Sequence, residues 1–407
     1  MSVIKFRVHP SLTLGVRFNS PMLARDFDFA LPPSLIAQTP AAPRDSSRLM
    51  RLNCARETVS HQVFRDLPDL LRPDDLLVFN DTRVLRARLR GAKILPDGTH
   101  GARVEALLLR ENAVNVWECL LKPSSRLRVG TPLRFASPDE AVFVIAETIE
   151  RRDESWMVRF NCDGDVRALL EKLGEVPLPP YIASRESDES DYQTIYARTS
   201  TRTASELSSQ HSALERNAPE SAAAPTAGLH FTPQLMQELK SRGIQTAFVT
   251  LGIGVGTFRP MKTEHIEEHA MHEESYEVSA GAAQKINAQR ARGGRVVSVG
   301  TTTTRVLESC CDESGTVQSG FNATSIFIRP GKTFRVVDAL ITNFHLPQST
   351  LLVMISALAQ HIQQRDGNST SSTRCESDGL RIVLEAYEQA VRERYRFFSF
   401  GDAMLIE

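Results

Sequence analysis

The sequence predicts an α/β protein that combines a small antiparallel β-barrel with a layered α/β domain. Short apolar runs recur at near-regular spacing between Asp75 and Phe160, which is typical of a barrel. After Asp165, helical and strand-like segments alternate, which indicates helices packed on a partly parallel sheet. With 407 residues, 41% of them hydrophobic and 24% charged, the chain has a globular composition and room for roughly two or three domains.

Residues 1–21 are expected to be a dispensable N-terminal extension. They show no clear periodicity, they precede a second methionine, Met22, and they lack the apolar stretch and cleavage site of a secretory signal. No apolar run approaches the ~20 residues of a membrane-spanning helix. The six cysteines are scattered without metal-site spacing, as is typical of reduced thiols. We therefore expect a cytoplasmic protein without membrane association.

The predicted barrel spans residues 75–160. Gly, Pro, Asp and Ser separate its expected strands, as turns require. In chain order these strands read LLVFN, VLRARL, RVEALLL, VWECLL, PLRFA, AVFVIAETI and WMVRF.

The predicted α/β domain continues to the C-terminus. Its helices include PQLMQELKSRG and LRIVLEAYEQAVRE, and its strands include IQTAFVTLG, RVVSVG and RVVDALITN. Two segments rich in small polar residues, 199–222 and 363–378, are expected to be surface loops.

Arg86, Arg88 and Arg90 alternate in TRVLRARLRGAK and would share one face of a strand, with Leu89 pointing into the barrel. The whole chain has 48 basic and 49 acidic residues, so it is no uniformly basic nucleic-acid binder. A contact with RNA would need a local patch, and these arginines are the candidate. The alternative is an ordinary solvated sheet face.

The segment RVVSVGTTTTRVLES reads as a strand, a glycine and a helix that begins with four threonines. Hydroxyl groups and free backbone N–H groups would converge at this helix N-terminus and favour a carboxylate or a phosphate. Thr301, Thr302 and Thr303 are the candidate binding residues. Threonine capping is the alternative, although one cap needs fewer threonines.

Histidines at two single positions and in one short motif are candidates for catalysis or metal binding. His230 and His345 lie beside expected strand or loop ends, where α/β proteins present reactive groups, although a lone histidine is commonly structural. The stretch from His265 to His269 matches H-x-x-E-H, so a zinc peptidase with Glu268 as the base is a rival hypothesis. The glycines of VTLGIGVGTFRP permit close approach of a ligand but do not match G-x-G-x-x-G.

Ten segments, in order from Phe27 to Ile406, together resemble the S-adenosylmethionine:tRNA ribosyltransferase-isomerase family. They are FDFALPPSLIAQTPAAPRDSSRLM, DLPDLLRPDDLLVFNDTRV, EVPLPPYI, DYQTIYAR, APTAGLHFT, VTLGIGVGTFRP, EEHAMHEE, RVVSVGTTTTRVLES, VDALITNFHLPQSTLL and YRFFSFGDAMLI. The chain departs from the family at Gly252, where a histidine is usual, and His265 is not part of the family pattern.

The resemblance implies a discontinuous main α/β domain, residues 22–74 and 161–407, with the barrel inserted between its parts. It implies transfer and isomerisation of the ribosyl group of S-adenosylmethionine to 7-aminomethyl-7-deazaguanine at the wobble position of tRNA. The products would be epoxyqueuosine-tRNA, adenine and methionine. The expected partners are S-adenosylmethionine, as a substrate, and this tRNA, with no obligate protein partner and no metal or other cofactor. The alternative is a non-catalytic RNA-binding protein.

Such a reaction needs a base, a proton donor for adenine, a binder for the methionine carboxylate and apolar faces near the sulfonium. His345 and His230 are the candidates for acid–base catalysis, and Thr301 to Thr303 for anion binding. Phe231 and Tyr181 are expected to pack on the nucleoside. Three further residues are expected to meet substrate where the barrel joins the main domain, namely Asn80, Asp81 and Arg83.

Overall fold

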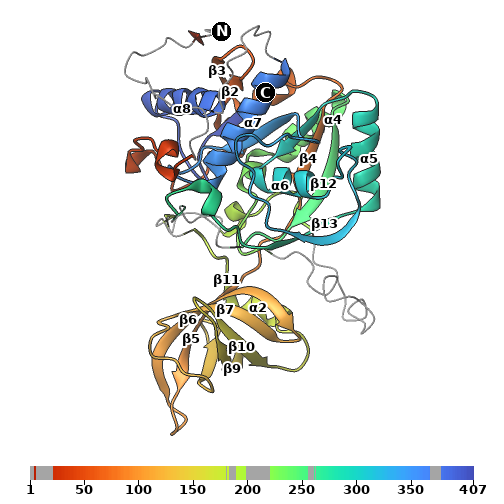
Figure 1. Ribbon diagram of the computed structural model, residues 1–407. Coiled ribbons are helices and arrows are strands. Elements are labelled where there is room, and N and C mark those ends of the chain that lie inside the picture. The colour runs from red at the N-terminus through yellow and green to blue at the C-terminus, as the bar shows by residue number, and fades with distance from the viewer. Residues whose placement is uncertain are drawn as a thin grey trace.

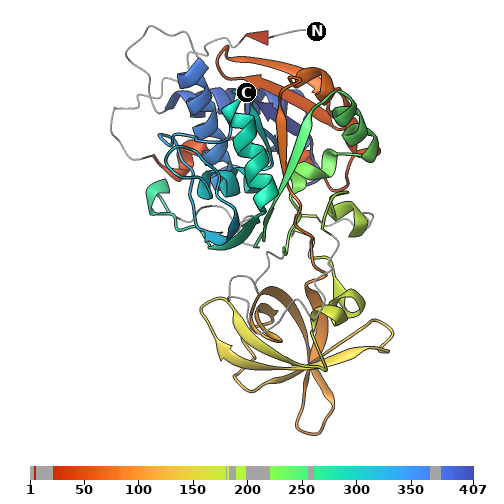
Figure 2. The ribbon, with the colours of Figure 1, turned by 90° about the vertical axis from the view of Figure 1, so that its right-hand side faces the viewer.

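A computed structural model describes residues 4–5, 22–179, 181–182, 189–198, 221–254, 261, 263–366 and 377–407. A large α/β domain and a smaller β-barrel lie one above the other, joined by extended segments (Figures 1 and 2). The predicted fold class is confirmed. The helices in the described part of the chain are too short or too polar to span a membrane.

The main domain is built on a ten-stranded mixed sheet in the order β1-β3-β2-β17-β16-β14-β4-β12-β13-β15. Its central strands β16, β14, β4 and β12 are mutually parallel. Every residue of β4, β14 and β16 is buried, as expected for parallel strands covered on both faces. The strands are β1 (Ile4–Lys5), β2 (Arg48–Asn53), β3 (Thr58–Val63), β4 (Leu76–Asn80), β12 (Gln245–Leu251), β13 (Glu274–Val278), β14 (Val296–Val299), β15 (Gly320–Thr324), β16 (Ala339–Asn343) and β17 (Ala403–Ile406).

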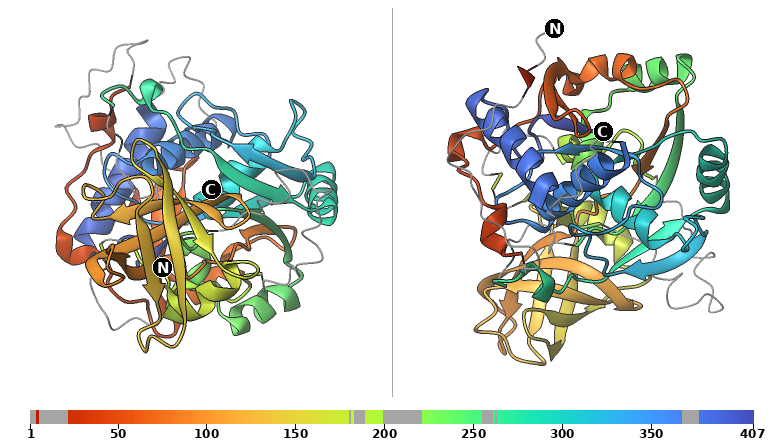
Figure 3. Two further views of the ribbon diagram at one scale, coloured as in Figure 1. Left: turned by 90° about the horizontal axis from the view of Figure 1, so that it is seen from below. Right: turned by 45° about the horizontal axis from the view of Figure 1, so that its top comes forward.

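Helices cover both faces of this sheet. Alternate β4 residues show the division, because Leu76 and Val78 belong to one apolar cluster, whereas Leu77 and Phe79 belong to another. The first cluster includes residues of α5 (Ala280–Ala291), α6 (Thr301–Ser309), α7 (Thr350–Asp366) and α8 (Ser377–Arg392). The second includes residues of α1 (Leu67–Leu70) and α4 (Pro233–Ser241). Helices α7 and α8 lie side by side (Figure 3, right).

The smaller domain is a closed antiparallel barrel, in the order β11-β5-β6-β7-β10-β9-β8, with a further β5–β8 pairing that closes it. Closure pairs both edges of the six strands from β5 to β8 in this order, and the two-residue β11 pairs with the first residues of β5. The strands are β5 (Arg88–Ile94), β6 (His100–Ala113), β7 (Val116–Lys122), β8 (Pro132–Ala136), β9 (Phe143–Arg151), β10 (Trp156–Asn161) and β11 (Gly174–Glu175). Helix α2 (Arg167–Leu173) contributes Leu170 and Leu173 to the barrel core. Leu89 is fully buried in that core, which confirms the predicted alternation along β5.

Both predicted bounds of the barrel, residues 75 and 160, were wrong. At its C-terminal end the barrel also includes α2 in its core and β11 beside β5. Leu76–Asn80 forms β4, a central strand of the main sheet, and the barrel begins only at β5. The two kinds of strand differ in pattern, because β4 is apolar on both faces whereas barrel strands such as β7 alternate. The barrel therefore follows directly from the carboxyl end of β4, and seen from below it lies in front of the main domain (Figure 3, left).

The expected loops need partial correction. Residues 363–366 belong to α7, and residues 377–378 belong to α8. Ser221 and Ala222 are buried beside the sheet. The intervening residues 199–220 and 367–376 lie outside the described part of the chain, as does most of the 1–21 segment, of which Ile4–Lys5 pairs with β3.

Candidate functional site

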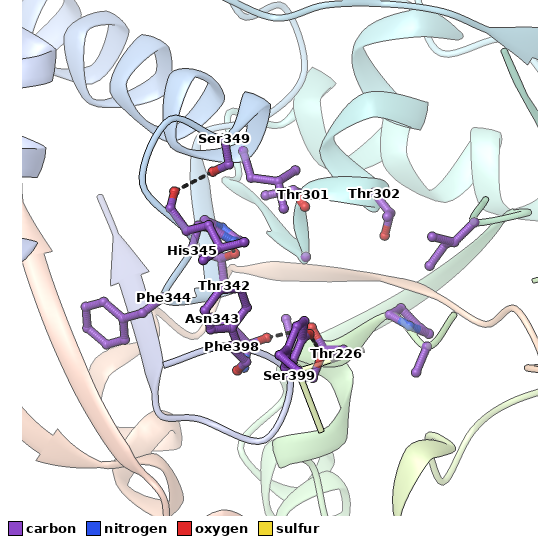
Figure 4. Close-up of a pocket in the computed structure, with 18 residues that line it drawn as sticks. Thr226, Thr301, Thr302, Thr342, Asn343, Phe344, His345, Ser349, Phe398 and Ser399 are labelled. Carbon is purple, nitrogen blue, oxygen red and sulfur yellow. Dashed lines mark hydrogen bonds between the residues drawn. The ribbon is translucent and has the colours of Figure 1, made fainter. Parts of the chain in front are cut away.

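A pocket of about 700 Å³ opens at the carboxyl edge of the parallel strands (Figure 4). Gly300 follows β14 and Asn343 ends β16, and these neighbouring parallel strands bring both residues to the same edge. This is the usual ligand position in an open α/β sheet. The lining residues are Tyr181, Ala224, Pro225, Thr226, Ala227, Ile253, Gly300, Thr301, Thr302, Thr342, Asn343, Phe344, His345, Leu346, Ser349, Leu351, Phe398 and Ser399.

The N-terminus of α6 forms one wall of the pocket. Gly300 precedes the helix with φ 89°, a conformation that favours glycine, and among the described residues no side chain caps the first turn. Thr301 and Thr302, the candidate anion-binding residues, line the pocket. The first N–H groups of a helix have no partner within it and carry partial positive charge. This wall is therefore suited to an anionic group.

Thr303 does not share this position, contrary to the prediction. It is fully buried, and its hydroxyl donates to the Val299 carbonyl oxygen at 2.7 Å. Threonines at i and i+1 on a helix point in different directions, so consecutive residues cannot all face one ligand. Thr303 fixes the start of α6 on the end of β14.

His345, a candidate for acid–base catalysis, lines the pocket. Its Nε2 lies 3.0 Å from the Thr342 hydroxyl, and its backbone N–H donates to the Tyr387 hydroxyl at 3.0 Å. Burial lowers the pKa of His345 to about 3. At neutral pH the ring is an uncharged imidazole, which can accept a proton.

His230 lies behind the pocket wall, with Asn343 between it and the cavity. Asn343 Nδ2 donates to the Phe398 carbonyl oxygen at 3.2 Å, which fixes the orientation of the amide. The same nitrogen donates to His230 Nε2 at 3.1 Å, so the ring proton lies on Nδ1 and points to the Ser47 hydroxyl 2.7 Å away. Burial first, and then nearby arginine charges, lower the pKa of His230 to about 3.

This arrangement corrects the prediction that His230 acts directly. Both of its ring nitrogens are used within the protein, and it does not line the pocket. It orients Asn343, whose Oδ1 accepts a hydrogen bond from Thr226 at 3.0 Å. His230 is thus a positioning residue, and Asn343 and Thr226 are the groups exposed to a ligand (Figure 4).

Aromatic residues form the opposite wall. The rings of Tyr181 and Phe398 lie 4.5 Å apart, and the Tyr181 hydroxyl is 2.5 Å from the Ser399 hydroxyl. Burial raises the pKa of Tyr181, so its phenol is neutral. Phe398 has φ 73°, a strained value for a bulky residue, and its N–H donates to the Phe344 carbonyl oxygen. The backbone therefore holds this ring against Tyr181.

Phe231, predicted to pack on the nucleoside, belongs instead to the hydrophobic core. Its side chain is fully buried in the apolar cluster that also holds Phe64 and Phe79, and its ring contacts both of theirs. The segment carrying His230 and Phe231 presents neither side chain to the pocket.

Asn80 and Asp81 support the site from the end of β4 without lining it. Asn80 Nδ2 lies 3.3 Å from the Thr302 hydroxyl and 3.3 Å from the Leu251 carbonyl oxygen. Asp81 accepts hydrogen bonds from the Thr250 hydroxyl at 2.6 Å and from Arg198 at 2.9 Å. Arg83 pairs with Glu171 at 3.1 Å on the surface, away from the pocket lining.

The arginine face of the barrel is largely paired within the protein. Arg86 lies 2.8 Å from Glu189, and Arg90 contacts Glu175 through two bonds of 2.7 and 2.9 Å. Arg88 is 3.7 Å from Glu105. These carboxylates neutralise much of the patch, and only the Arg90 side chain of the three remains mostly exposed, at 61%. Its contact with RNA stays a prediction.

The rival zinc pattern does not form the geometry that it requires. Ile266–Glu268 is a single 3-10 turn, and His265 and His269 flank it in extended conformations. Two histidines four residues apart share a face only on a continuous helix. Within the described residues, no cluster of three His, Cys, Asp or Glu side chains is arranged to hold a metal ion.

Sequence reasoning missed Thr226, Thr342, Asn343, Phe398 and Ser399. A signal existed for Asn343 and Thr342, because both end the apolar strand ALITN just before His345. For Phe398 and Ser399 there was none, since they reach the pocket only through the path of the C-terminal segment.

The chain is similar to known proteins along nearly its whole length. The family described as Queuosine biosynthesis protein matches residues 24–406. A relative from Desulfitobacterium hafniense, named S-adenosylmethionine:tRNA ribosyltransferase-isomerase, is 44% identical over 386 residues, covering 95% of this chain and 100% of the relative. A relative of the same name from Carboxydothermus hydrogenoformans is 46% identical over 385 residues, with the same coverage. The crystal structure of S-adenosylmethionine tRNA ribosyltransferase from Thermotoga maritima is 33% identical, covers 94% of this chain and 100% of that chain, and has a TM-score of 0.48.

Proposed function

The chain belongs to the queuosine biosynthesis protein family, and from this membership we propose that it is an S-adenosylmethionine:tRNA ribosyltransferase-isomerase. It transfers and isomerises the ribosyl group of S-adenosylmethionine onto the 7-aminomethyl-7-deazaguanine of a tRNA. The products are epoxyqueuosine-tRNA, adenine and methionine. Both substrates are intracellular molecules, so we propose that the enzyme acts in the cytoplasm.

The observation that carries this proposal is the composition of the pocket. Its described lining holds no carboxylate, lysine or arginine, and its aromatic wall of Tyr181 and Phe398 stands opposite a helix N-terminus. Aromatic faces attract a cation such as a sulfonium, and the apolar lining suits the uncharged parts of a nucleoside. The pocket lies at the carboxyl edge of the sheet, from which the chain enters the barrel. An RNA substrate could therefore contact both domains.

The chemistry begins at the carbon next to the sulfonium. The positive sulfur acidifies the C5′ protons, so a base can remove one; adenine then leaves with its bonding electrons, and the substrate amine loses a proton and forms the bond to C1′. The C5′ electron pair closes the carbon ring on C1′ and releases the ring oxygen, and this oxygen forms the epoxide at C5′ as methionine leaves with the electrons of the carbon–sulfur bond. His345 is the candidate base, because it is the one imidazole in the described pocket lining and is uncharged at neutral pH. We propose that S-adenosylmethionine is consumed as a substrate and that no further cofactor takes part.

The proposal is tested by product formation. The purified protein is incubated with S-adenosylmethionine and a tRNA carrying the aminomethyl base, and mass spectrometry follows free adenine and the mass of the tRNA. We expect both to change together, in chelator-washed protein as well. If the tRNA binds but neither product forms, the protein is a non-catalytic RNA binder. If turnover requires added metal, the cofactor-free chemistry is wrong.

A further inference from the structure

Two arginines are buried among the described residues of the main domain, and they differ in how many of their nitrogens have hydrogen-bond acceptors. Arg295 donates from Nε and Nη2 to Asp75, at 2.8 and 2.7 Å, and from Nη1 to Glu407 at 2.5 Å. Its three nitrogens all have acceptors, as a structural arginine requires. Arg305 is buried more deeply, with 3% of its side chain exposed against 7% for Arg295.

Arg305 has only one of its three nitrogens paired within the described residues. Nη1 contacts Glu274, whereas Nε and Nη2 are buried without a hydrogen-bond partner. Buried guanidinium nitrogens without an acceptor are costly, and native proteins rarely keep them without a reason. The unused donors match the spacing of a carboxylate, which accepts two parallel bonds from one guanidinium.

Arg305 lines a second, smaller hollow that adjoins the main pocket. The two cavities share Thr301, Thr302 and Leu351. The rest of the hollow is mostly apolar, with walls such as Phe327 and Met354, and in the described lining Arg305 is its only charged residue. It is thus a short, mostly apolar recess that begins at the N-terminus of α6 and is lined by the arginine whose Nε and Nη2 have no acceptor among the described residues.

We propose that this recess binds the amino-acid end of S-adenosylmethionine, with the carboxylate on Nε and Nη2 of Arg305. The inference rests on the proposed function and extends it to a subsite. With the nucleoside in the main pocket, the sulfonium lies near Thr301 and Thr302, and the methylene groups of the methionyl chain run along the apolar walls. The free N–H groups at the start of α6 face the same carboxylate.

Charge balance favours an amino acid over a phosphate here. Glu274 already neutralises Arg305, and its other oxygen accepts the Gly254 N–H at 3.0 Å. A phosphate would leave net negative charge in a buried site, which is unfavourable. An amino-acid group carries both an ammonium and a carboxylate, so it adds no net charge when it enters.

The test compares S-adenosylmethionine with its decarboxylated analogue, which keeps the nucleoside, the sulfonium and the amine. Adenine release in the presence of tRNA gives kcat/KM for each, and calorimetry gives each binding constant without tRNA. The wild-type protein should prefer S-adenosylmethionine by about 10- to 150-fold, the range for hydrogen bonds to a charged group. In Arg305→Met this preference should fall at least severalfold, mainly through weaker affinity for S-adenosylmethionine, and only the part that the N–H groups of α6 supply should remain.

The preference is a ratio measured on one sample, so it does not depend on how much of a variant is folded. Arg295→Met is the matched control, because it removes a buried, fully paired arginine and should lower stability while leaving the preference unchanged. The subsite assignment is overturned if Arg305→Met keeps the wild-type preference, or if it weakens tRNA binding instead, which would identify an RNA phosphate as the ligand. A wild-type protein that binds S-adenosylmethionine with the preference but releases no adenine refutes the proposed function and leaves the subsite standing.

Discussion

The two buried histidines should make the folded protein sensitive to mild acid. The pKa of His230 and that of His345 are each lowered from 6.5 to about 3 in the folded state. Between these values the unfolded chain binds more protons than the folded one, so acid favours unfolding. The stabilising contribution is complete above about pH 6.5 and is lost as pH falls toward 3.

The size of this effect at pH 5 is set almost wholly by the unfolded chain. There the unfolded imidazole is nearly fully protonated, whereas the folded imidazole is not. Each histidine should therefore remove roughly 2 kcal/mol of unfolding free energy between pH 8 and pH 5, about 1.4 kcal/mol for each pH unit below 6.5. A folded pKa one unit higher or lower than about 3 changes this figure very little.

Urea unfolding of the wild type and of His230→Gln and His345→Gln, at pH 8 and pH 5, measures the effect. Each variant should lose about 2 kcal/mol less than the wild type between the two pH values. Other groups that titrate contribute equally to all three proteins and cancel in the comparison. His100, exposed on the barrel, is the control, and His100→Gln should leave the wild-type difference unchanged. If His345→Gln shows the full wild-type loss at pH 5, the ring is not held neutral in the pocket, and its assignment as the base fails.

Two further predictions concern strand β5. Leu89→Ala should lower the unfolding free energy of the barrel by about 2 to 5 kcal/mol, because it opens a cavity in a fully buried position. Arg88→Ala should lower it by less than about 1 kcal/mol. Equal losses of the two variants in urea unfolding would mean that the strand faces the other way. Replacing Arg86, Arg88 and Arg90 together by alanine should weaken tRNA binding, with Arg90 contributing most. The slope of log K for tRNA binding against log salt concentration should become shallower by about 0.7 to 0.9 for each phosphate that the arginines no longer neutralise. An unchanged slope would place the RNA surface elsewhere.

The sequence predicted the fold class because its two periodicities differ. Barrel strands such as β7 bury alternate residues, whereas the sequence signal of the barrel was the near-regular spacing of short apolar runs between turn residues. The misassigned strand β4 has no such alternation, since LLVFN is apolar at every position but the last. A short continuous apolar run does not reveal which sheet will bury it, so its place depended on long-range pairing with β12 and β14.

The predicted residues that lie at the pocket are those whose positions follow from the local sequence. The residues that were missed reach the site through tertiary contacts. Thr301 and Thr302 follow from a strand, a glycine and a helix start, all read within one segment. Arg305 lies in the next turn of the same helix, where an arginine is ordinarily taken as solvent-exposed. Its burial comes from Glu274 on β13 and from residues after β15, which no local pattern indicates.

Under the proposed function, burial of His345 would let one pocket hold both a base and a sulfonium. A protonated imidazole would repel the positive sulfur and could not accept a proton, so a histidine with its ordinary pKa of 6.5 would be partly unsuitable at neutral pH. Lowering that pKa to about 3 keeps the ring uncharged, although it also makes the ring a weaker base. The sulfonium compensates for the weak base by acidifying the proton to be removed. The absence of carboxylates from the described pocket lining then leaves the aromatic wall to stabilise the cation, without a competing anionic base beside it.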